Sequence, residues 1–153
     1  MGPEGGEAVR IAVNVPDAHE VPRALMRRGV VRTLEHEGVD EGEVSVTCLG
    51  DDPIRELNRI YLGHDRITDV LAFALHGQGE PPLGDVYIGV EQARRQAGEL
   101  KIPLDEELVR LAIHGVLHVL GHDHPEGPRE VREESPHYKL QERLIRQVME
   151  EGR

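Results

Sequence analysis

The chain reads His114-Gly-Val-Leu-His118-Val-Leu-Gly121-His122-Asp123-His124 at the point that decides its fold. Residues four apart on an α-helix lie about 40° apart around the axis and roughly 6 Å along it, so His114 and His118 point the same way. Gly121 follows, and glycine readily adopts the left-handed backbone that ends a helix. The chain can then turn back and present His124 from a loop, which brings three imidazoles to one metal ion.

Three neutral nitrogen donors leave the fourth position of a zinc ion open, and an open position distinguishes a catalytic zinc from a structural one. The alternative is that these histidines are ordinary hydrogen-bonded residues of a core. The segment 108–120 is apolar almost all round, which predicts a buried helix. Burying two unpaired imidazoles would cost roughly 1–3 kcal/mol each, and a shared metal removes that cost for both. The sequence therefore predicts one zinc ion, held by His114, His118 and His124.

The length and composition of the chain indicate one domain. Its 153 residues suit a single core, and we expect a loose, Gly-rich N-terminus over 1–8 and a single metal-binding catalytic domain over 9–153. No segment approaches the length of a membrane span, and the N-terminus lacks the apolar core of a signal peptide. The single cysteine, Cys48, excludes an internal disulfide framework and fits a reducing compartment. A cytoplasmic protein without a membrane partner is the expectation.

The formal net charge of −11 is unfavourable for binding nucleic acid. Phosphate binding depends on lysine and arginine, and the field of so acidic a chain repels RNA. Three tyrosines and one phenylalanine are the only aromatic residues, which argues against a platform that stacks bases. The acidity still permits a locally basic cleft. It predicts that any RNA binding is weak without a partner.

Periodicity places the remaining elements along the chain. Alternating apolar residues predict strands over 9–15, 43–49, 68–74 and 83–90. Helical stripes and start signals predict helices over 21–34 and 91–100, and helices that begin at Asp52-Pro53, Pro103 and Ser135-Pro136. Asp52 and Ser135 are expected to be the N-cap residues. This order of elements indicates an α+β or α/β domain in which helices pack on a four-stranded sheet.

Three motifs follow one another along the chain: Leu57-Asn58…Tyr61…Thr68-Asp69-Val70-Leu71-x-Phe73, then Leu83-Gly84-Asp85, then the histidine stretch. Their order and spacing resemble the YbeY family of bacterial zinc-dependent endoribonucleases and ribosomal RNA maturation factors. The resemblance runs from about the second strand to the last helix. It implies an α+β, zincin-like domain with a mixed sheet of four strands and about five helices. It also implies that His114, His118 and His124 are the zinc ligands.

The resemblance further implies a function in RNA metabolism. The expected activity is a single-strand-specific endoribonuclease that matures the 3′ end of small-subunit ribosomal RNA and acts in ribosome quality control. The implied partners are single-stranded or ribosomal RNA and the small ribosomal subunit with its proteins. DNA is not expected to be a partner.

Outside the three proposed zinc ligands, some residues differ from those common in the family, and others are only candidates for a role. Family members commonly carry an arginine directly after the tyrosine of the first motif, where this chain has Leu62. Arg59 and Arg66 are therefore candidate phosphate contacts, although each alone could be an ordinary solvent-exposed arginine. His122, which stands where a tyrosine is frequent, is a further candidate for binding substrate.

The candidate catalytic residues are His114, Asp85 and Asp123. His122 and Asp123 lie nearest in sequence to the ligands, but the general base stays unassigned. Asp85 is a motif position that could orient a ligand histidine. The alternative for Asp85 is a capping role at a turn or strand end.

Two other functions compete with RNA hydrolysis. Metzincin peptidases share the histidine spacing, but their general base is a glutamate at the position of Gly115, and a glycine cannot replace it. The second competitor is a non-catalytic ribosome-assembly factor stabilised by zinc. Structural zinc usually has four protein ligands, and His122 could be the fourth, although so close to His124 it is expected to point elsewhere. RNA hydrolysis by zinc is the preferred hypothesis.

Overall fold

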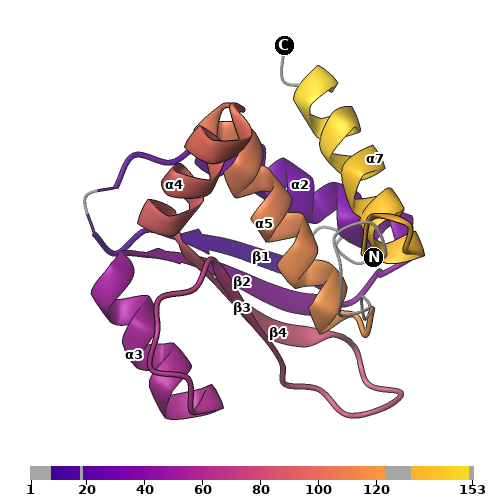
Figure 1. The fold of residues 1–153 in the computed structure, drawn as a ribbon. Helices are drawn as coiled ribbons and strands as arrows, with labels where there is room; N and C mark the ends of the chain where they lie inside the picture. Colours follow the sequence, from indigo (N-terminus) through magenta and orange to yellow (C-terminus); the bar gives the residue numbers. More distant parts are fainter. Residues whose placement is uncertain (1–7, 18, 123–131, 152–153) are drawn as a thin grey trace.

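The computed structural model describes residues 8–17, 19–122 and 132–151 (Figure 1). Its sheet contains β1 (Val9–Asn14), β2 (Gly42–Leu49), β4 (Leu83–Gly89) and β3 (Val70–Ala74), in that spatial order. β1 and β4 both run parallel to β2, whereas β3 runs antiparallel to β4. The sheet is therefore mixed, and its strands lie almost where the alternation of apolar residues predicted them. The expected loose segment 1–8 lies outside the described residues except for Ala8.

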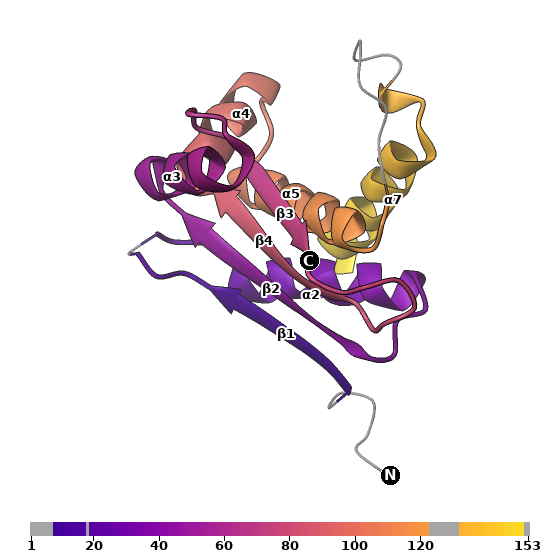
Figure 2. The ribbon, with the colours of Figure 1, turned by 90° about the horizontal axis from the view of Figure 1, so that it is seen from below.

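Five helices accompany the sheet in the described residues: α2 (Arg23–His36), α3 (Asp51–Leu62), α4 (Val90–Leu100), α5 (Leu104–Val119) and α7 (Pro136–Glu151). α5 is central, because it packs on β3 and β4 and also contacts α2, α4 and α7. Helices α2, α4, α5 and α7 lie on one side of the sheet, and the view from below shows the other face with α3 near one end (Figures 1 and 2). The described residues thus form one α+β domain. None of its described helices is long and apolar enough to cross a bilayer.

The main core lies between α5 and the sheet. Val86 and Ile88 of β4 are fully buried there, as are Val44 and Val46 of β2. α5 itself is apolar nearly all round and buries most of its residues, which confirms the buried helix expected from the sequence. Cys48 of β2 belongs to the same core and is fully buried.

Two glycines let α5 approach β4 closely. A Cβ atom on Gly115 would lie 2.5 Å from Cγ1 of Val86, and a Cβ atom on Gly84 would lie 2.5 Å from Cγ1 of Val119. Real side chains do not come so close, so both positions require glycine. The position at which a metzincin carries its glutamate therefore faces the packed sheet.

The opposite sheet face carries a smaller apolar cluster under α3. Ile54 of α3 is fully buried there with Leu49 and Leu71. Phe73 packs edge-on between Tyr61 and Tyr87, at ring-centroid distances of 5.6 Å and 6.1 Å. Three of the four aromatic residues therefore form a row, which their small number did not suggest.

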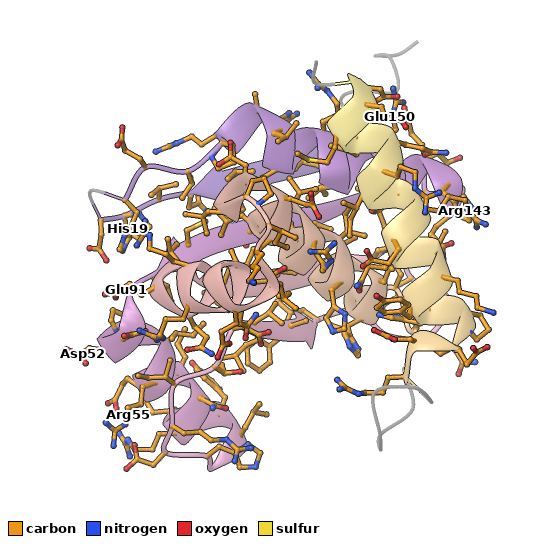
Figure 3. The ribbon with its side chains drawn as sticks, turned by 45° about the horizontal axis from the view of Figure 1, so that its top comes forward. His19, Asp52, Arg55, Glu91, Arg143 and Glu150 are labelled. Carbon is orange, nitrogen blue, oxygen red and sulfur yellow. The ribbon has the colours of Figure 1, made fainter. Side chains whose placement is uncertain are left out.

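Local sequence determines some helix ends, and contacts with distant residues determine others. Gly121 has a φ of 96° and ends α5 as expected, since its N–H donates to the carbonyl of His118 at 2.9 Å. Ser135 caps α7 as expected, because its Oγ accepts from the N–H of Tyr138 at 3.1 Å. The expected cap at Asp52 is wrong. The observed N-cap is Gly50, two residues earlier, and the N–H of Asp51 donates at 2.8 Å to Oε1 of Glu91, a side chain from α4. Figure 3 labels Asp52, in the first turn of α3, and Glu91, in the first turn of α4.

Candidate metal centre

His114 and His118 lie on one face of α5, as their spacing predicted. Their Nε2 atoms are 3.1 Å apart, and both rings are partly buried. Two imidazole nitrogens bound to one tetrahedral zinc ion, at about 2.0–2.1 Å each, would be about 3.3 Å apart. The two nitrogens therefore already have nearly the separation that one shared ion requires.

The third imidazole in the described part of the site is His137, from the first turn of α7. The possible ligand atoms of His114, His118 and His137 all lie within 4.8 Å of one another. The side chain of His137 is almost fully buried, with an exposed fraction of 4%. His124 and Asp123 lie outside the described residues. His137 was not predicted from the sequence, because no regular spacing links it to the histidine motif.

Gln141 orients the ring of His114. Its Oε1 lies 2.7 Å from Nδ1 of His114, while its Nε2 donates to Oε2 of Glu142 at 3.2 Å. An amide oxygen can only accept, so Nδ1 of His114 carries the proton and Nε2 keeps its lone pair. Metal-binding histidines commonly have such a partner on the second ring nitrogen. The three-nitrogen set, with one tautomer already fixed, fits a transition-metal ion.

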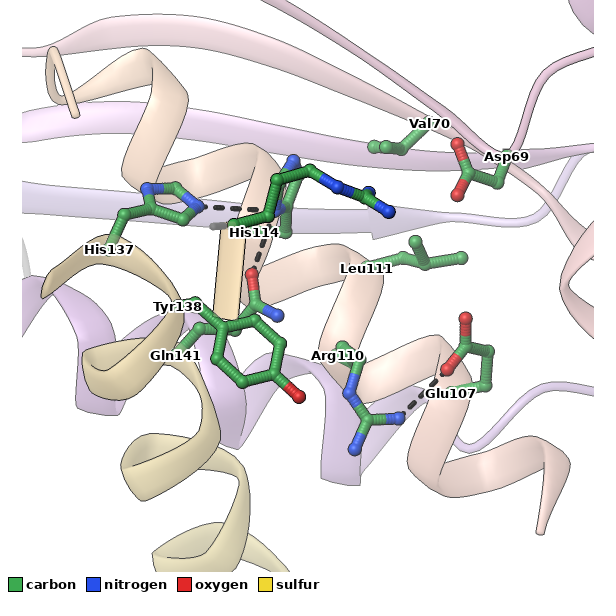
Figure 4. A pocket seen from close by; sticks show the side chains of 10 residues that line it. Asp69, Val70, Glu107, Arg110, Leu111, His114, His137, Tyr138 and Gln141 are labelled. Atoms are coloured by element: carbon green, nitrogen blue, oxygen red, sulfur yellow. Dashed lines mark hydrogen bonds and ion pairs between the residues drawn. The ribbon is translucent and has the colours of Figure 1, made fainter. Parts of the chain in front are cut away.

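An open pocket of about 370 Å³ adjoins His114 (Figure 4). The start of β3, helix α5 and the region around the start of α7 form its wall: Asp69, Val70, Glu107, Arg110, Leu111, His114, Arg132, His137, Tyr138 and Gln141. The candidate metal centre is thus accessible from one side to a molecule larger than water. Charged groups of both signs surround the approach to it.

Among the charged side chains around the pocket, Arg110 is bound most strongly by its neighbours. Its guanidinium donates to Glu107 at 2.8 Å and to Glu142 at 2.9 Å. Burial acts to lower the pKa of Arg110, but these carboxylates outweigh it and the pKa is raised. Burial also raises the pKa of Glu107 despite the arginine. Arg110 therefore stays charged, with much of its positive charge already matched inside the protein.

The candidate phosphate contacts at α3 are not brought to this pocket. Arg59 donates to Glu56, three residues before it on α3. Arg66 lies in the loop that follows, where its carbonyl oxygen accepts from Nδ2 of Asn58 at 3.0 Å. Neither arginine is among the described residues that line the pocket. Two other arginines line it, Arg110 and Arg132, and neither was expected from the sequence.

Asp85 lies on the other side of the sheet from His114. Its neighbours Gly84 and Val86 face α5, so the alternation of the strand turns Asp85 to the opposite face. There its Oδ1 accepts a hydrogen bond of 2.8 Å from Oγ of Ser45 on β2. The structure therefore does not bring Asp85 together with the histidines.

His122 is held against the end of α2. Its Nε2 forms a short contact with Oε1 of Glu37, and its ring centroid is 6.2 Å from that of His137. Burial acts to raise the pKa of Glu37, but hydrogen bonds from His122 and His36 outweigh it and lower that pKa. His122 thus borders the histidine cluster without lining the described pocket.

Known proteins resemble this chain in both sequence and fold. The family model described as Endoribonuclease YbeY matches residues 13–148. Endoribonuclease YbeY of Thermus thermophilus is 42% identical over 122 residues, which cover 74% of this chain and 86% of that protein. The Persephonella marina protein of the same name is 39% identical over 118 residues, covering 73% and 76%. The solution structure of TM1509 from Thermotoga maritima superposes with a TM-score of 0.62 at 26% identity, covering 94% of this chain and 90% of that one.

Proposed function

The chain belongs to the endoribonuclease YbeY family, and on that premise we propose that it is a zinc-dependent endoribonuclease that cleaves single-stranded RNA. The observation that carries this proposal is the pair of Nε2 atoms of His114 and His118, 3.1 Å apart, beside an open pocket. A metal site beside accessible space suits hydrolysis better than a buried structural site does.

We propose zinc as the metal, with His114, His118 and His124 as ligands. Imidazole nitrogen suits zinc, as it also suits nickel and iron, and three such donors leave room for a substrate. A zinc ion supplies Lewis acidity, which lowers the pKa of a water molecule towards 7 and polarises a phosphoryl oxygen.

The protein residues around this site have separate tasks in the proposal. Gln141 holds the proton on Nδ1 of His114 and so keeps Nε2 available. Arg132 lies at the pocket wall, where it can attract a phosphate group. His122 and Asp123 stay the candidates for the general base. Asp85, bonded to Ser45 on the far sheet face, has no task in this proposal.

The biological role that we propose is maturation of the 3′ end of small-subunit ribosomal RNA, together with ribosome quality control. The family membership supports this role, and the small subunit with its proteins would be the partner. A net charge of −11 favours such a partner, because the chain alone repels RNA. We propose the cytoplasm as the site of action, and we expect no DNA substrate.

The decisive experiment compares cleavage of a single-stranded ribosomal RNA fragment by the zinc-loaded protein and by His114→Ala. His64→Ala, at an exposed position after α3, controls for changes in histidine content and purification. Loss of cleavage in His114→Ala alone supports the proposal. Equal cleavage by all three proteins would instead indicate a contaminating nuclease, and favour a non-catalytic zinc-stabilised ribosome factor.

Peptide hydrolysis has less support from the structure. A general base at position 115 would need a side chain where a Cβ atom already collides with Val86. The metzincin mechanism therefore has neither the residue nor the space for it at this position.

A further inference from the structure

We propose that His137 is itself a ligand of the metal, so that one ion joins α7 to α5. The inference rests on the proposed metal site but not on RNA cleavage. His137 lies beyond the histidine motif in sequence, and only the packing of α7 on α5 brings it to His114 and His118.

The position of His137 in the cluster carries this inference. Its ring centroid is 4.9 Å from that of His114 and 5.3 Å from that of His118. Its Nε2 lies 3.2 Å from Nδ1 of His114, the nitrogen that Gln141 engages, so the ring of His137 would have to turn towards Nε2 of His114 to reach the ion. A side chain that is 4% exposed has few routes to water, so its polar atoms depend on partners within the protein. A metal ion would engage the lone pairs of all three rings at once.

The rearrangement that binding requires is small. Ligand nitrogens on one tetrahedral zinc ion are about 3.3 Å apart. The three candidate atoms already lie within 4.8 Å of one another, so no pair has to close by more than about 1.5 Å. The ring of His137 would have to supply a movement of this size. With His124 also bound, a substrate atom would take the fifth position of the ion, a coordination that catalytic zinc reaches in the transition state.

Helix α7 thereby contributes to the site twice. His137 and Gln141 are four residues apart and share a face of α7. Gln141 bonds to Nδ1 of His114, and His137 lies beside the same ring (Figure 4). Ser135 fixes the start of this helix by capping Tyr138. Metal binding and the docking of α7 on α5 are therefore coupled, and each stabilises the other.

The test measures zinc affinity and the zinc-dependent rise in melting temperature, without RNA. His137→Gln keeps the size and polarity of the buried side chain, and His64→Gln is the matched exposed control. We expect His137→Gln to bind zinc at least about 10-fold more weakly than the wild type, since even the partners of ligands have effects of that size. We expect the double variant His124→Ala/His137→Gln to bind zinc more weakly than either single variant, because each change removes one proposed ligand. Unchanged zinc affinity in a folded His137→Gln protein would overturn the inference.

A second measurement covers the case in which His137→Gln fails to fold. Hydrogen exchange in the wild-type protein, with and without zinc, reports how firmly α7 is held. Slower exchange in α7 on addition of zinc supports the coupling, and unchanged exchange contradicts it. A wild-type protein that binds no zinc would overturn the proposed function as well. Zinc binding that depends on His137, combined with no RNA cleavage, would overturn the proposed function alone.

Discussion

Oε1 of Gln141 accepts a hydrogen bond from Nδ1 of His114 over 2.7 Å, across the interface between α7 and α5. This contact decides which nitrogen of His114 can bind a metal. It also makes the chemistry of the histidine motif depend on a helix outside that motif.

Replacing Gln141 by leucine should weaken zinc binding without removing a ligand. His114 would lose the acceptor that fixes its tautomer, and such partners commonly contribute about 10–100-fold to metal affinity. Competition with a coloured chelator measures the affinity. Gln147→Leu, on the exposed side of the same helix, is the control and should bind zinc like the wild type. Equal affinities in the two variants would show that Gln141 does not orient His114.

Gly115→Ala should destabilise the fold, although alanine is the better helix former. The new methyl group would meet Val86 at 2.5 Å, and overpacking of this kind costs about 1–3 kcal/mol. Gly98→Ala in α4 is the matched control, because no atom lies within 4 Å of its added methyl group. That variant should gain up to about 1 kcal/mol. Urea unfolding of both variants measures the difference, and two equally stable variants would contradict the close contact between α5 and β4.

Glu142→Gln should lower stability at neutral pH but not in acid. Burial acts to raise the pKa of Glu142, but hydrogen bonds from Arg110 outweigh it and lower that pKa below its ordinary value of 4.5. A lowered pKa in the folded state stabilises the protein above the unfolded pKa, and this contribution disappears as pH falls through the folded pKa.

The free energies of unfolding of the wild type and Glu142→Gln should therefore differ by about 1–3 kcal/mol at pH 7. They should converge once the pH has fallen below the lowered pKa of Glu142 in the folded protein. Glu150→Gln, at an exposed position of the same helix, is the control. A difference that persists in acid would mean that packing, rather than the ion pair with Arg110, is responsible.

Leu62→Arg should strengthen RNA binding and make it more dependent on salt. Leu62 is 49% exposed at the end of α3, so an arginine fits there without disturbing the core. One added phosphate contact steepens the salt dependence of the binding constant by about one unit. Leu100→Arg, at an equally exposed helix end (46%), adds the same charge elsewhere. An identical gain from both variants would indicate an effect of net charge alone.

The sequence predicted those features that depend on neighbouring residues. The spacing of His114 and His118 predicted their common face, and Gly121 predicted the end of α5. Ser135 predicted the start of α7 correctly. The cap at Asp52 was wrong because the acceptor, Glu91, comes from another helix.

The rest of the site depends on how α7 packs on α5. His137 and Gln141 carry no spacing signal toward His114, so only the tertiary structure reveals them. The position of Asp85 is a different case. Buried Val86 and Ile88 alternate with Asp85 and Tyr87, so the strand pattern already indicated which sheet face Asp85 occupies.

Cys48 lies fully buried in β2, and burial raises the pKa of its thiol to about 11. At pH 7 roughly one such thiol in ten thousand is ionised, so an alkylating reagent scarcely reacts with the closed molecule. Because the chain has one cysteine, each labelled molecule has opened its core at least once. The rate of alkylation therefore measures how often the core of the domain opens. The same measurement with zinc would show by how much the bound ion slows this opening.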